Sequence, residues 1–218
     1  MSAGGMIERV VARGVVKTYG TTAALRGVNA TIEAGRLTLI EGANGSGKST
    51  LLGILGTVVR PTSGTVVYEP LGEDAGQVRG AIGWLSHESL AYPDLTGRQN
   101  IELAASFHGL EATEAWRQAE ERFELGSFAL RPLRTCSRGQ RQRIALARAL
   151  VHEPSLVLLD EPTTGLDRSG VARLLTVVDA EVGRGAAVVV VSHEPEVFRS
   201  RAAARLTLER GRAVSDAV

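Results

Sequence analysis

A glycine-rich loop between an apolar run and a leucine-rich run is the feature that most constrains the fold of this sequence. Residues 41–50 read EGANGSGKST, directly after LTLI, and LLGIL follows. Gly42, Gly47, Lys48 and Ser49 satisfy the pattern G-x-x-x-x-G-K-[ST]. Glycines let backbone amides converge on phosphate oxygens, and the helix that follows adds the positive end of its dipole. The loop therefore predicts a strand, loop and helix unit that binds a phosphate-bearing ligand.

Lys48 and Ser49 supply the charge and the hydroxyl of this loop. A lysine ammonium neutralises the β and γ phosphates as a compact point charge, which the planar fork of arginine would not replace well. The choice is informative, because Lys17 and Lys48 are the only lysines among 25 basic residues. The hydroxyl of Ser49 is a ligand for Mg²⁺ in this pattern. The alternative interpretation is an ordinary glycine turn.

A second element is the run LVLLDE at residues 156–161, which delivers Asp160 and Glu161 to the end of an apolar strand. Two adjacent carboxylates at such a position are costly unless a cation or hydrogen bonds satisfy them. Asp160 can bind Mg²⁺ through water, and Glu161 can orient or deprotonate an attacking water. The alternative interpretation is a solvated strand end.

The hydrophobic pattern divides the chain into strand-rich halves with a helical segment between them. Residues 7–40 read as short β-rich segments, and continuous apolar runs at 155–162 and 186–194 are typical of strands buried on both faces of a parallel sheet. Residues 96–150 turn helical, and residues 204–214 predict a closing hairpin. In the helical segment one face gathers apolar side chains, which we interpret as core packing: Ala112, Ala115, Trp116, Ala119 and Phe123.

Three shorter segments complete the expected order. The run STLLGILGTV at 49–58 predicts a helix whose apolar face holds four side chains: Leu51, Leu52, Leu55 and Val58. The runs PTSGTVVY at 61–68 and AIGWLS at 81–86 predict strands. In a parallel sheet, ligands bind at the carboxyl ends of the strands, where both carboxylates and the glycine loop are expected.

Composition excludes several classes of function. The chain has 218 residues and a formal net charge of +1, so one compact domain is expected and no bulk field attracts nucleic acid. The single cysteine, Cys136, fits a reducing compartment, and the first residues lack the pattern of a secretory signal. The longest apolar stretch, at 185–192, is far shorter than the roughly 20 residues of a membrane span. We therefore expect a cytoplasmic protein, and any membrane-spanning partner would be another chain.

The segment CSRGQRQRIALARAL at residues 136–150 lies between the two phosphate elements and resembles the LSGGQ signature and the helix after it. This segment identifies the resemblance as one to the nucleotide-binding subunit of ATP-binding cassette (ABC) transporters, over nearly the whole chain. The resemblance implies an α/β fold, with a P-loop NTPase core of ABC type, an N-terminal antiparallel β region and an inserted helical subdomain. It implies one ABC ATPase domain over residues 1–218, with its nucleotide-binding core at 1–86 and 151–218 and its helical subdomain at 87–150.

The resemblance implies a role for individual residues. His193 in VVSHE matches the switch histidine, and it joins Glu161 and Lys48 as a catalytic residue. Tyr19 in VVKTYG matches the aromatic residue that stacks on adenine, and Asp167 in PTTGLD matches a residue that communicates across a dimer. Alone, Asp167 also reads as a helix cap. The implied ATP contacts are Tyr19, Gly42, Ala43, Asn44, Gly45, Ser46, Gly47, Lys48, Ser49, Thr50, Ser137, Gly139 and Gln140, and the implied Mg²⁺ ligands are Ser49, His87 and Asp160.

Three positions depart from the family pattern. His87 stands where glutamine is usual, and it would add a group that titrates near neutral pH. Cys136 and Arg138 stand where leucine and glycine are usual, and Arg138 would either weaken docking of the signature or add a charge that faces the phosphates. The segments HESLAYPDLTGRQNI and CSRGQ resemble the ATP-binding subunit of the heme exporter used in cytochrome c maturation. Related exporters of other cargo share much of that pattern.

The resemblance also implies partners. ATP would lie between the glycine loop of one cassette and the signature of a second, either another copy of this chain or a different cassette. Closure of the pair would act on an integral membrane transporter subunit at the cytoplasmic face of the inner membrane. Glu88, Tyr92 and Asp94 are candidates for that contact, and the alternative for them is a plain exposed loop. We expect an ATPase that powers an exporter and binds no nucleic acid. The alternatives are a soluble ABC-type regulatory or assembly factor, and a P-loop kinase or GTPase, which the signature segment disfavours.

Overall fold

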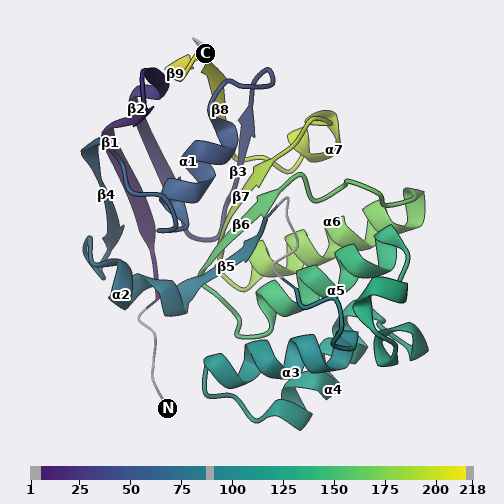
Figure 1. Cartoon of the computed structure of the whole chain (residues 1–218). Helices are drawn as coiled ribbons and strands as arrows, with labels where there is room; N and C mark the ends of the chain where they lie inside the picture. The colour runs from purple at the N-terminus through teal and green to yellow at the C-terminus, as the bar shows by residue number, and fades with distance from the viewer. Residues whose placement is uncertain (1–5, 87–90, 215–218) are drawn as a thin grey trace.

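The computed structural model describes residues 6–86 and 91–214, which build two β-sheets and the helices that cover them (Figure 1). The smaller sheet is antiparallel and has the strand order β2-β1-β4. Its strands are β1 (Arg9–Tyr19), β2 (Thr22–Glu33) and β4 (Ser63–Glu69). This sheet is the antiparallel β region expected near the N-terminus, with β4 added from beyond the glycine loop.

The larger sheet has six strands in the order β5-β6-β7-β3-β8-β9. Its five neighbouring strands from β5 to β8 are parallel, and β9 pairs antiparallel with β8 as the expected hairpin. The strands are β3 (Leu37–Glu41), β5 (Ile82–Leu85), β6 (Leu156–Asp160), β7 (Ala187–Val191), β8 (Ala204–Glu209) and β9 (Arg212–Val214). The α/β fold class is confirmed.

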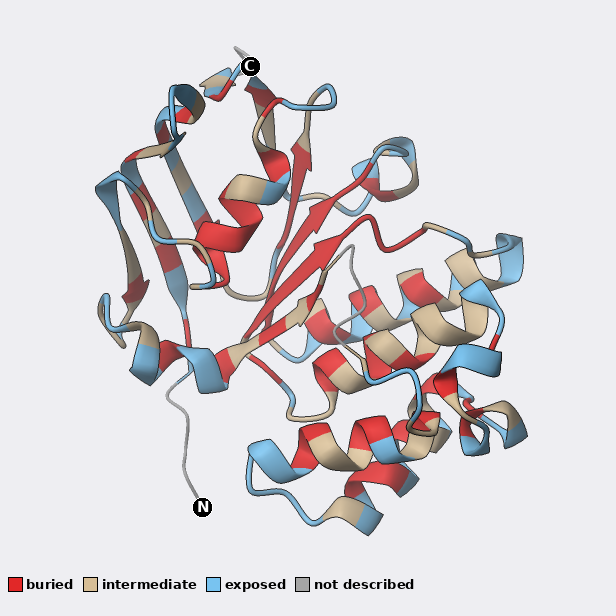
Figure 2. Ribbon diagram, viewed as in Figure 1, coloured by how far each residue is buried: buried red, intermediate tan, exposed pale blue. Residues whose placement is uncertain are grey.

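The central strands β6 and β7 are buried along their whole length (Figure 2). Successive side chains of a strand point to opposite faces, so each strand contributes to two cores. In β6, Leu156 and Leu158 join the core on the side of the small sheet, whereas Val157 and Leu159 join the core under the helices. An unbroken apolar run is therefore what a strand in this position requires.

Helix α1 (Lys48–Leu55) lies between the two sheets, and its side chains Leu51, Leu52 and Leu55 are buried there (Figure 1). The predicted helical face also included Val58, and that part was wrong. The helix ends at Leu55, and Val58 is 68% exposed. The chain turns away because the C-cap is a glycine and the next residue, Thr57, has a positive φ of 61°.

The helices on the other face of the large sheet form the helical part of the molecule (Figure 1). Helices α5 (Arg138–Leu150) and α6 (Arg168–Gly183) cover the sheet, and α3 (Gly97–Phe107) and α4 (Ala112–Phe123) pack outside α5. The predicted face of α4 is confirmed for Ala115, Trp116, Ala119 and Phe123, which are buried, whereas its first member, Ala112, is only half-buried. Two further helices, α2 (Ala75–Val78) and α7 (Glu196–Arg199), are short.

The start of α3 is fixed by side chains of its first turn. Thr96 and Gln99 form a reciprocal capping box that satisfies two main-chain N–H groups. The side chain of Asn100 is fully buried, accepts from the N–H of Tyr92 at 2.7 Å and donates to the Tyr92 carbonyl at 3.0 Å. These bonds hold the segment before α3 against the helix.

No helix in the described ranges combines the length and the apolar character that a membrane span requires.

Candidate active site

The carboxyl edge of the large sheet carries an open hollow between the glycine loop and the ends of β6 and β7. The hollow encloses about 1210 Å³ when the open space at its mouth is included. Its lining comes from the loop, from the end of β1 and from the segments after β6 and β7: Tyr19, Ala24, Asn44, Gly45, Gly47, Lys48, Ser49, Thr50, Asp160, Glu161 and His193. Segments far apart in the sequence therefore meet where the strand pattern predicted a ligand site.

Two glycines are required by the shape of the loop. Gly42 has a φ of 144°, and a Cβ there would lie 2.3 Å from the carbonyl oxygen of Leu208. Gly47 has a φ of 105°, and a Cβ there would lie 2.6 Å from the carbonyl oxygen of Ala24. Neither position has room for a side chain, and both use backbone angles that glycine adopts most readily. The loop is thus held against β2 and β8 by contacts between backbones.

The ammonium of Lys48 is folded into the loop that precedes it. Its Nζ donates to the carbonyl oxygens of Gly42 at 2.7 Å and Ala43 at 3.0 Å, which uses two of the three N–H donors of an ammonium. Lys48 is also the first residue of α1, and no acidic side chain lies in the first turn of that helix. The positive end of the helix dipole and the ammonium therefore act in the same place, which favours an anion.

Two further predicted residues, Ser46 of the loop and Tyr19 at the end of β1, differ in their exposure. The side chain of Ser46 is buried, and its Oγ has no hydrogen-bond partner among the residues that the structure describes. Tyr19 ends β1 with 51% of its surface exposed, and Lys17 Nζ lies 4.9 Å from the centre of its ring. An exposed aromatic ring at the rim of the hollow is suited to stacking on a flat ligand.

Glu161 and His193 are brought together at the ends of β6 and β7. The N–H of His193 donates to Oε2 of Glu161 at 2.8 Å, and Nε2 of His193 lies 3.2 Å from Oε1 of Glu161. Glu161 has a φ of 51°, which is uncommon for a residue other than glycine, and its N–H donates to the carbonyl of Val191 at 2.9 Å. The carboxylate is buried, whereas the imidazole is half exposed toward the hollow.

The residues present fit a magnesium ion. Asp160 is a buried carboxylate, and Asp160 and the hydroxyl-bearing Ser49 line the same hollow. Within the described ranges, no group of three or more His, Cys, Asp and Glu side chains could hold a metal by itself. Mg²⁺ suits such a site, because it is usually held by one or two carboxylates together with substrate phosphates and water. The third predicted ligand, His87, lies outside the described residues, as does Glu88.

The signature residues lie apart from this hollow. Ser137 is the N-cap of α5, its Oγ accepts from the N–H of Gln140 at 3.3 Å, and the side chain of Gln140 accepts from the N–H of Ser137. Gly139 lies against the loop after β6, since a Cβ there would be 3.3 Å from the carbonyl oxygen of Gly165. Among the described residues that line the hollow, Ser137, Gly139 and Gln140 do not occur.

Two contacts made by α5 were not foreseen from the sequence. The side chain of Gln142 donates to the carbonyl of Pro162 at 3.1 Å, so the signature helix is bonded to the residue after Glu161. Arg138 lies over Gly165, where a Cβ would be 2.5 Å from Cδ of the arginine. A polar residue two positions beyond the signature was the only available signal for the first contact. Asp167 caps α6 by accepting from the N–H of Gly170 at 2.7 Å.

Comparison with known proteins agrees with this geometry. The family model described as ABC transporter matches residues 25–164, which is more than half of the chain. The daunorubicin resistance ATP-binding protein DrrA3 of Streptomyces coeruleorubidus is 36% identical over 93% of this chain and 66% of its own length. The pyoverdine export ATP-binding/permease protein PvdT of Pseudomonas syringae pv. tomato is 34% identical over 94% of this chain. This chain spans only 33% of the length of PvdT.

A solved structure is similar over nearly its whole length. It is the dimeric structure of the ATP-binding cassette MJ0796 in a post-hydrolysis state with ADP and Pi, with a TM-score of 0.87 and 31% identity. The match covers 94% of this chain and 97% of that one. On this fold, this site and these matches, the chain belongs to the ABC transporter family, as an ATP-binding cassette.

Proposed function

We propose that this chain hydrolyses ATP at the hollow beside its glycine loop and uses the cycle to drive a membrane transporter. The observation that carries the proposal is the meeting of three groups at one edge of the sheet: the Lys48 ammonium, the Glu161 carboxylate and the His193 imidazole. An ammonium for the phosphates and a buried carboxylate for water are the parts that phosphoryl transfer to water requires. The solved relative with ADP and Pi supports the same reaction class.

Each residue has a defined task in this reaction. Lys48 and the amides of the loop bind the phosphates, and Tyr19 stacks on the base. Glu161 orients the attacking water and takes up its proton, and His193 holds the carboxylate in place through its N–H and ring contacts. Ser49 and Asp160 would hold Mg²⁺, which would supply charge neutralisation at the phosphate oxygens.

We further propose that a second cassette completes the site. The supporting observation is that Ser137 and Gln140 cap a helix away from the hollow, so their polar groups face another surface. A head-to-tail pair would bring the signature of one copy to the ATP of the other, and each pair would hold two such sites. The solved relative is also dimeric.

The membrane partner is proposed to dock on the helical segment. We divide the domain into a nucleotide-binding core at 1–86 and 151–218 and a helical subdomain at 87–150, and α3 to α5 support that division. Tyr92 is 49% exposed, and Asp94 pairs at the surface with Arg134 at 3.0 Å, so both candidate contacts are accessible. The chain would then be peripheral on the cytoplasmic face of the inner membrane.

The proposed transport direction is export, because the two curated relatives named above are described by pyoverdine export and daunorubicin resistance. Those cargoes belong to the relatives. The heme assignment rests on His87 and the CSRGQ segment, and the comparisons add no support to it. We therefore assign no cargo to this chain.

The proposal is tested by exchanging the carboxylate of Glu161 for an amide. Glu161→Gln keeps the shape and the contact with His193 but removes the base, so ATP turnover should fall about a hundredfold or more. The variant should also accumulate as an ATP-bound dimer, which light scattering with and without ATP would detect. Lys48→Ala should instead lose binding of a labelled ATP analogue.

The matched control is Glu121→Gln, which makes the same exchange on α4, at a side chain that is 83% exposed. Its turnover should equal that of the unchanged protein. Normal ATP turnover by Glu161→Gln would remove Glu161 from the reaction and overturn the proposed mechanism.

A further inference from the structure

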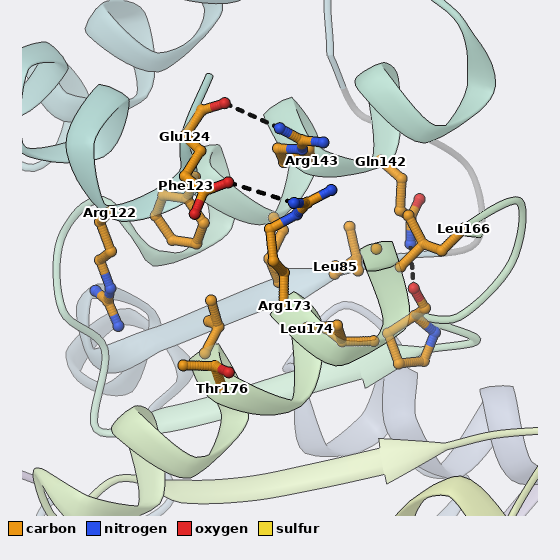
Figure 3. Close-up of a pocket in the computed structure, with 14 residues that line it drawn as sticks. Leu85, Arg122, Phe123, Glu124, Gln142, Arg143, Leu166, Arg173, Leu174 and Thr176 are labelled. Atoms are coloured by element: carbon orange, nitrogen blue, oxygen red, sulfur yellow. Dashed lines mark hydrogen bonds and ion pairs between the residues drawn. The ribbon is translucent and has the colours of Figure 1, made fainter. Parts of the chain in front are cut away.

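A second cavity lies away from the active site, in the wedge between the helical segment and α6 (Figure 3). It encloses about 710 Å³ when the open space at its mouth is counted. Its walls come from α4 and α5 on one side and from α6 and the loop after β6 on the other. A molecule bound here would contact both parts of the cassette.

The interior of this wedge cavity is apolar. Six aliphatic or aromatic side chains line it: Leu85, Phe123, Leu146, Leu166, Leu174 and Val177. Apolar surface that faces an empty cavity loses both the hydrophobic gain and the dispersion contacts of packing. The interior therefore favours an apolar group.

The mouth of the cavity is cationic. Arg173 and Arg143 approach each other there and share one acidic residue, Glu124 (Figure 3). Nη1 of Arg173 lies 3.4 Å from the Glu124 carboxylate, whereas Nη1 of Arg143 donates to the Glu124 main-chain carbonyl at 2.9 Å. The third arginine of the lining, Arg122, is paired with the buried Glu181 instead.

These two guanidinium groups are undersupplied with anionic partners. Burial, and then the neighbouring charge of Arg173, lower the pKa of Arg143. Nε of Arg173 is buried, and no acceptor for it occurs among the residues that the structure describes. The other nearby acid, Asp167, is already bonded to the N–H of Gly170 and the hydroxyl of Ser169. A buried donor without an acceptor is destabilising, so the mouth of the cavity favours an anion over a cation.

We propose that the wedge cavity is a binding site for a small amphipathic anion, a molecule with an apolar body and one carboxylate or sulfonate head. The body fills the apolar interior, and the head accepts from the guanidinium group of Arg173 and lies beside Arg143. Neither of these arginines belongs to the proposed ATP site, so the inference is separate from the hydrolysis chemistry.

Occupancy of this site changes ATP turnover. Pro162 and Leu166 line the cavity, Pro162 directly follows Glu161, and Leu166 directly precedes Asp167. An anion wedged there restrains the loop that carries both residues against α5. This second part rests on the proposed function, whereas binding of the anion does not.

Binding is measured first, with the full chain and the dye 8-anilinonaphthalene-1-sulfonate as the probe. We expect one dye bound for each chain, displacement by octanoate and no displacement by octylammonium. Arg173→Gln should weaken the dye about tenfold, because it removes a hydrogen bond between charged groups. The same variant should bind the uncharged N-phenyl-1-naphthylamine as well as the unchanged protein does.

A second variant keeps the site testable if Arg173→Gln is poorly folded. Val177→Phe fills the interior and should abolish binding of both dyes, whereas Val214→Phe, a partly exposed valine on β9, should leave both unchanged. Dye binding that survives Val177→Phe at full strength would place the dye elsewhere and overturn the proposed site. Absence of binding to the unchanged protein would overturn it as well.

Turnover is measured second. Octanoate should change the ATPase rate of the unchanged protein at least about twofold and leave the rate of Val177→Phe unaffected. Binding without any change in rate would overturn the coupling and leave the site standing. Loss of ATPase activity in every sample, with dye binding intact, would instead count against the proposed function.

Discussion

At the scale of single residues, the contact between Arg138 and Gly165 links the first turn of α5 to the loop after β6. Its aliphatic part covers Gly165, and that glycine has a φ of 77° and no room for a Cβ. Through this contact, the loop between Glu161 and Asp167 packs against the first turn of α5. Arg138 also lines a smaller hollow with Asp160 and Glu161. The side chain therefore connects the signature to the proposed catalytic loop within one subunit.

Substitutions of Arg138 separate packing from charge. Arg138→Ala removes the carbon atoms that cover Gly165, and we expect ATP turnover to fall on the order of tenfold because the loop is less well positioned. Arg138→Gln keeps Cγ and Cδ, so it should retain most of the activity. Steady-state ATPase assays would distinguish the two. A Gln variant as impaired as the Ala variant would show that the charge, and not the covering of Gly165, matters.

The sequence predicted local motifs better than it predicted contacts between residues that are distant in the chain. The pattern G-x-x-x-x-G-K-[ST] predicted which residues surround the Lys48 ammonium, because a local motif fixes a local loop. The contact of Arg138 with Gly165 and the bond from Gln142 to Pro162 join segments that are distant in the chain. No periodicity reports such pairs, so the two outcomes foreseen for Arg138, weaker docking or added charge, did not include it.

At the scale of elements, α1 depends on a strand of the other sheet. Tyr68 of β4 donates its hydroxyl to the Leu55 carbonyl at 2.8 Å and reaches the Ile54 carbonyl at 3.3 Å. Both carbonyls lie at the end of α1, where a helix leaves its last carbonyls without intrahelical donors, and the Ile54 carbonyl also accepts from the N–H of Thr57 at 3.0 Å. Burial raises the pKa of the Tyr68 hydroxyl, so it stays a donor across the physiological range. The small sheet thereby fixes the helix that begins at Lys48.

Removal of this hydroxyl tests the connection. Tyr68→Phe takes the hydroxyl donor from the Leu55 carbonyl, and we expect unfolding to become easier by about 1–3 kcal/mol. The exposed Tyr92→Phe, which loses a hydroxyl at the surface, should stay within about 0.5 kcal/mol of the unchanged protein. Urea unfolding followed by circular dichroism measures both. Equal midpoints for the two variants would mean that water replaces the hydroxyl.

Element types followed from the sequence, but sheet membership did not. The runs at 61–68 and 81–86 both read correctly as strands, yet β4 joins the antiparallel sheet and β5 the parallel one. Pairing depends on which strand lies alongside, and a short alternating run carries no information about its neighbour. The continuous run of β6 was more informative, because burial on both faces leaves a parallel sheet as its natural place.

At the scale of the whole molecule, the helical segment and the core meet at a pair of histidines. The rings of His108, at the end of α3, and His152, after α5, are stacked with centroids 3.6 Å apart and planes 5° apart. His152 Nε2 lies 3.2 Å from the carbonyl of Ile82. Burial, and then the neighbouring His108, lower the pKa of His152 to about 4. The stacked contact therefore favours neutral imidazole rings.

This pair predicts a loss of stability in acid. Because the unfolded chain binds a proton at a pKa of about 6.5 and the folded chain only near 4, the free energy of unfolding should fall as pH drops through that window. Discounted for partial exposure, the loss is about 2 kcal/mol. His152→Phe keeps the stacking and removes the titration, so its unfolding midpoint should change less between pH 7 and pH 4.5. An identical change in both proteins would assign the acid sensitivity to other groups.

The allocation of alternate β6 side chains to two cores has a consequence for how this cassette can vary. Inserting or deleting a single residue in that strand would exchange the side chains that follow it between the two packing environments. It would also move the carboxylates of Asp160 and Glu161 about 3.3 Å along the strand relative to the glycine loop. Packing and the position of the carboxylates therefore both fix the length of β6. Related sequences should differ in this strand by substitutions and not by insertions or deletions.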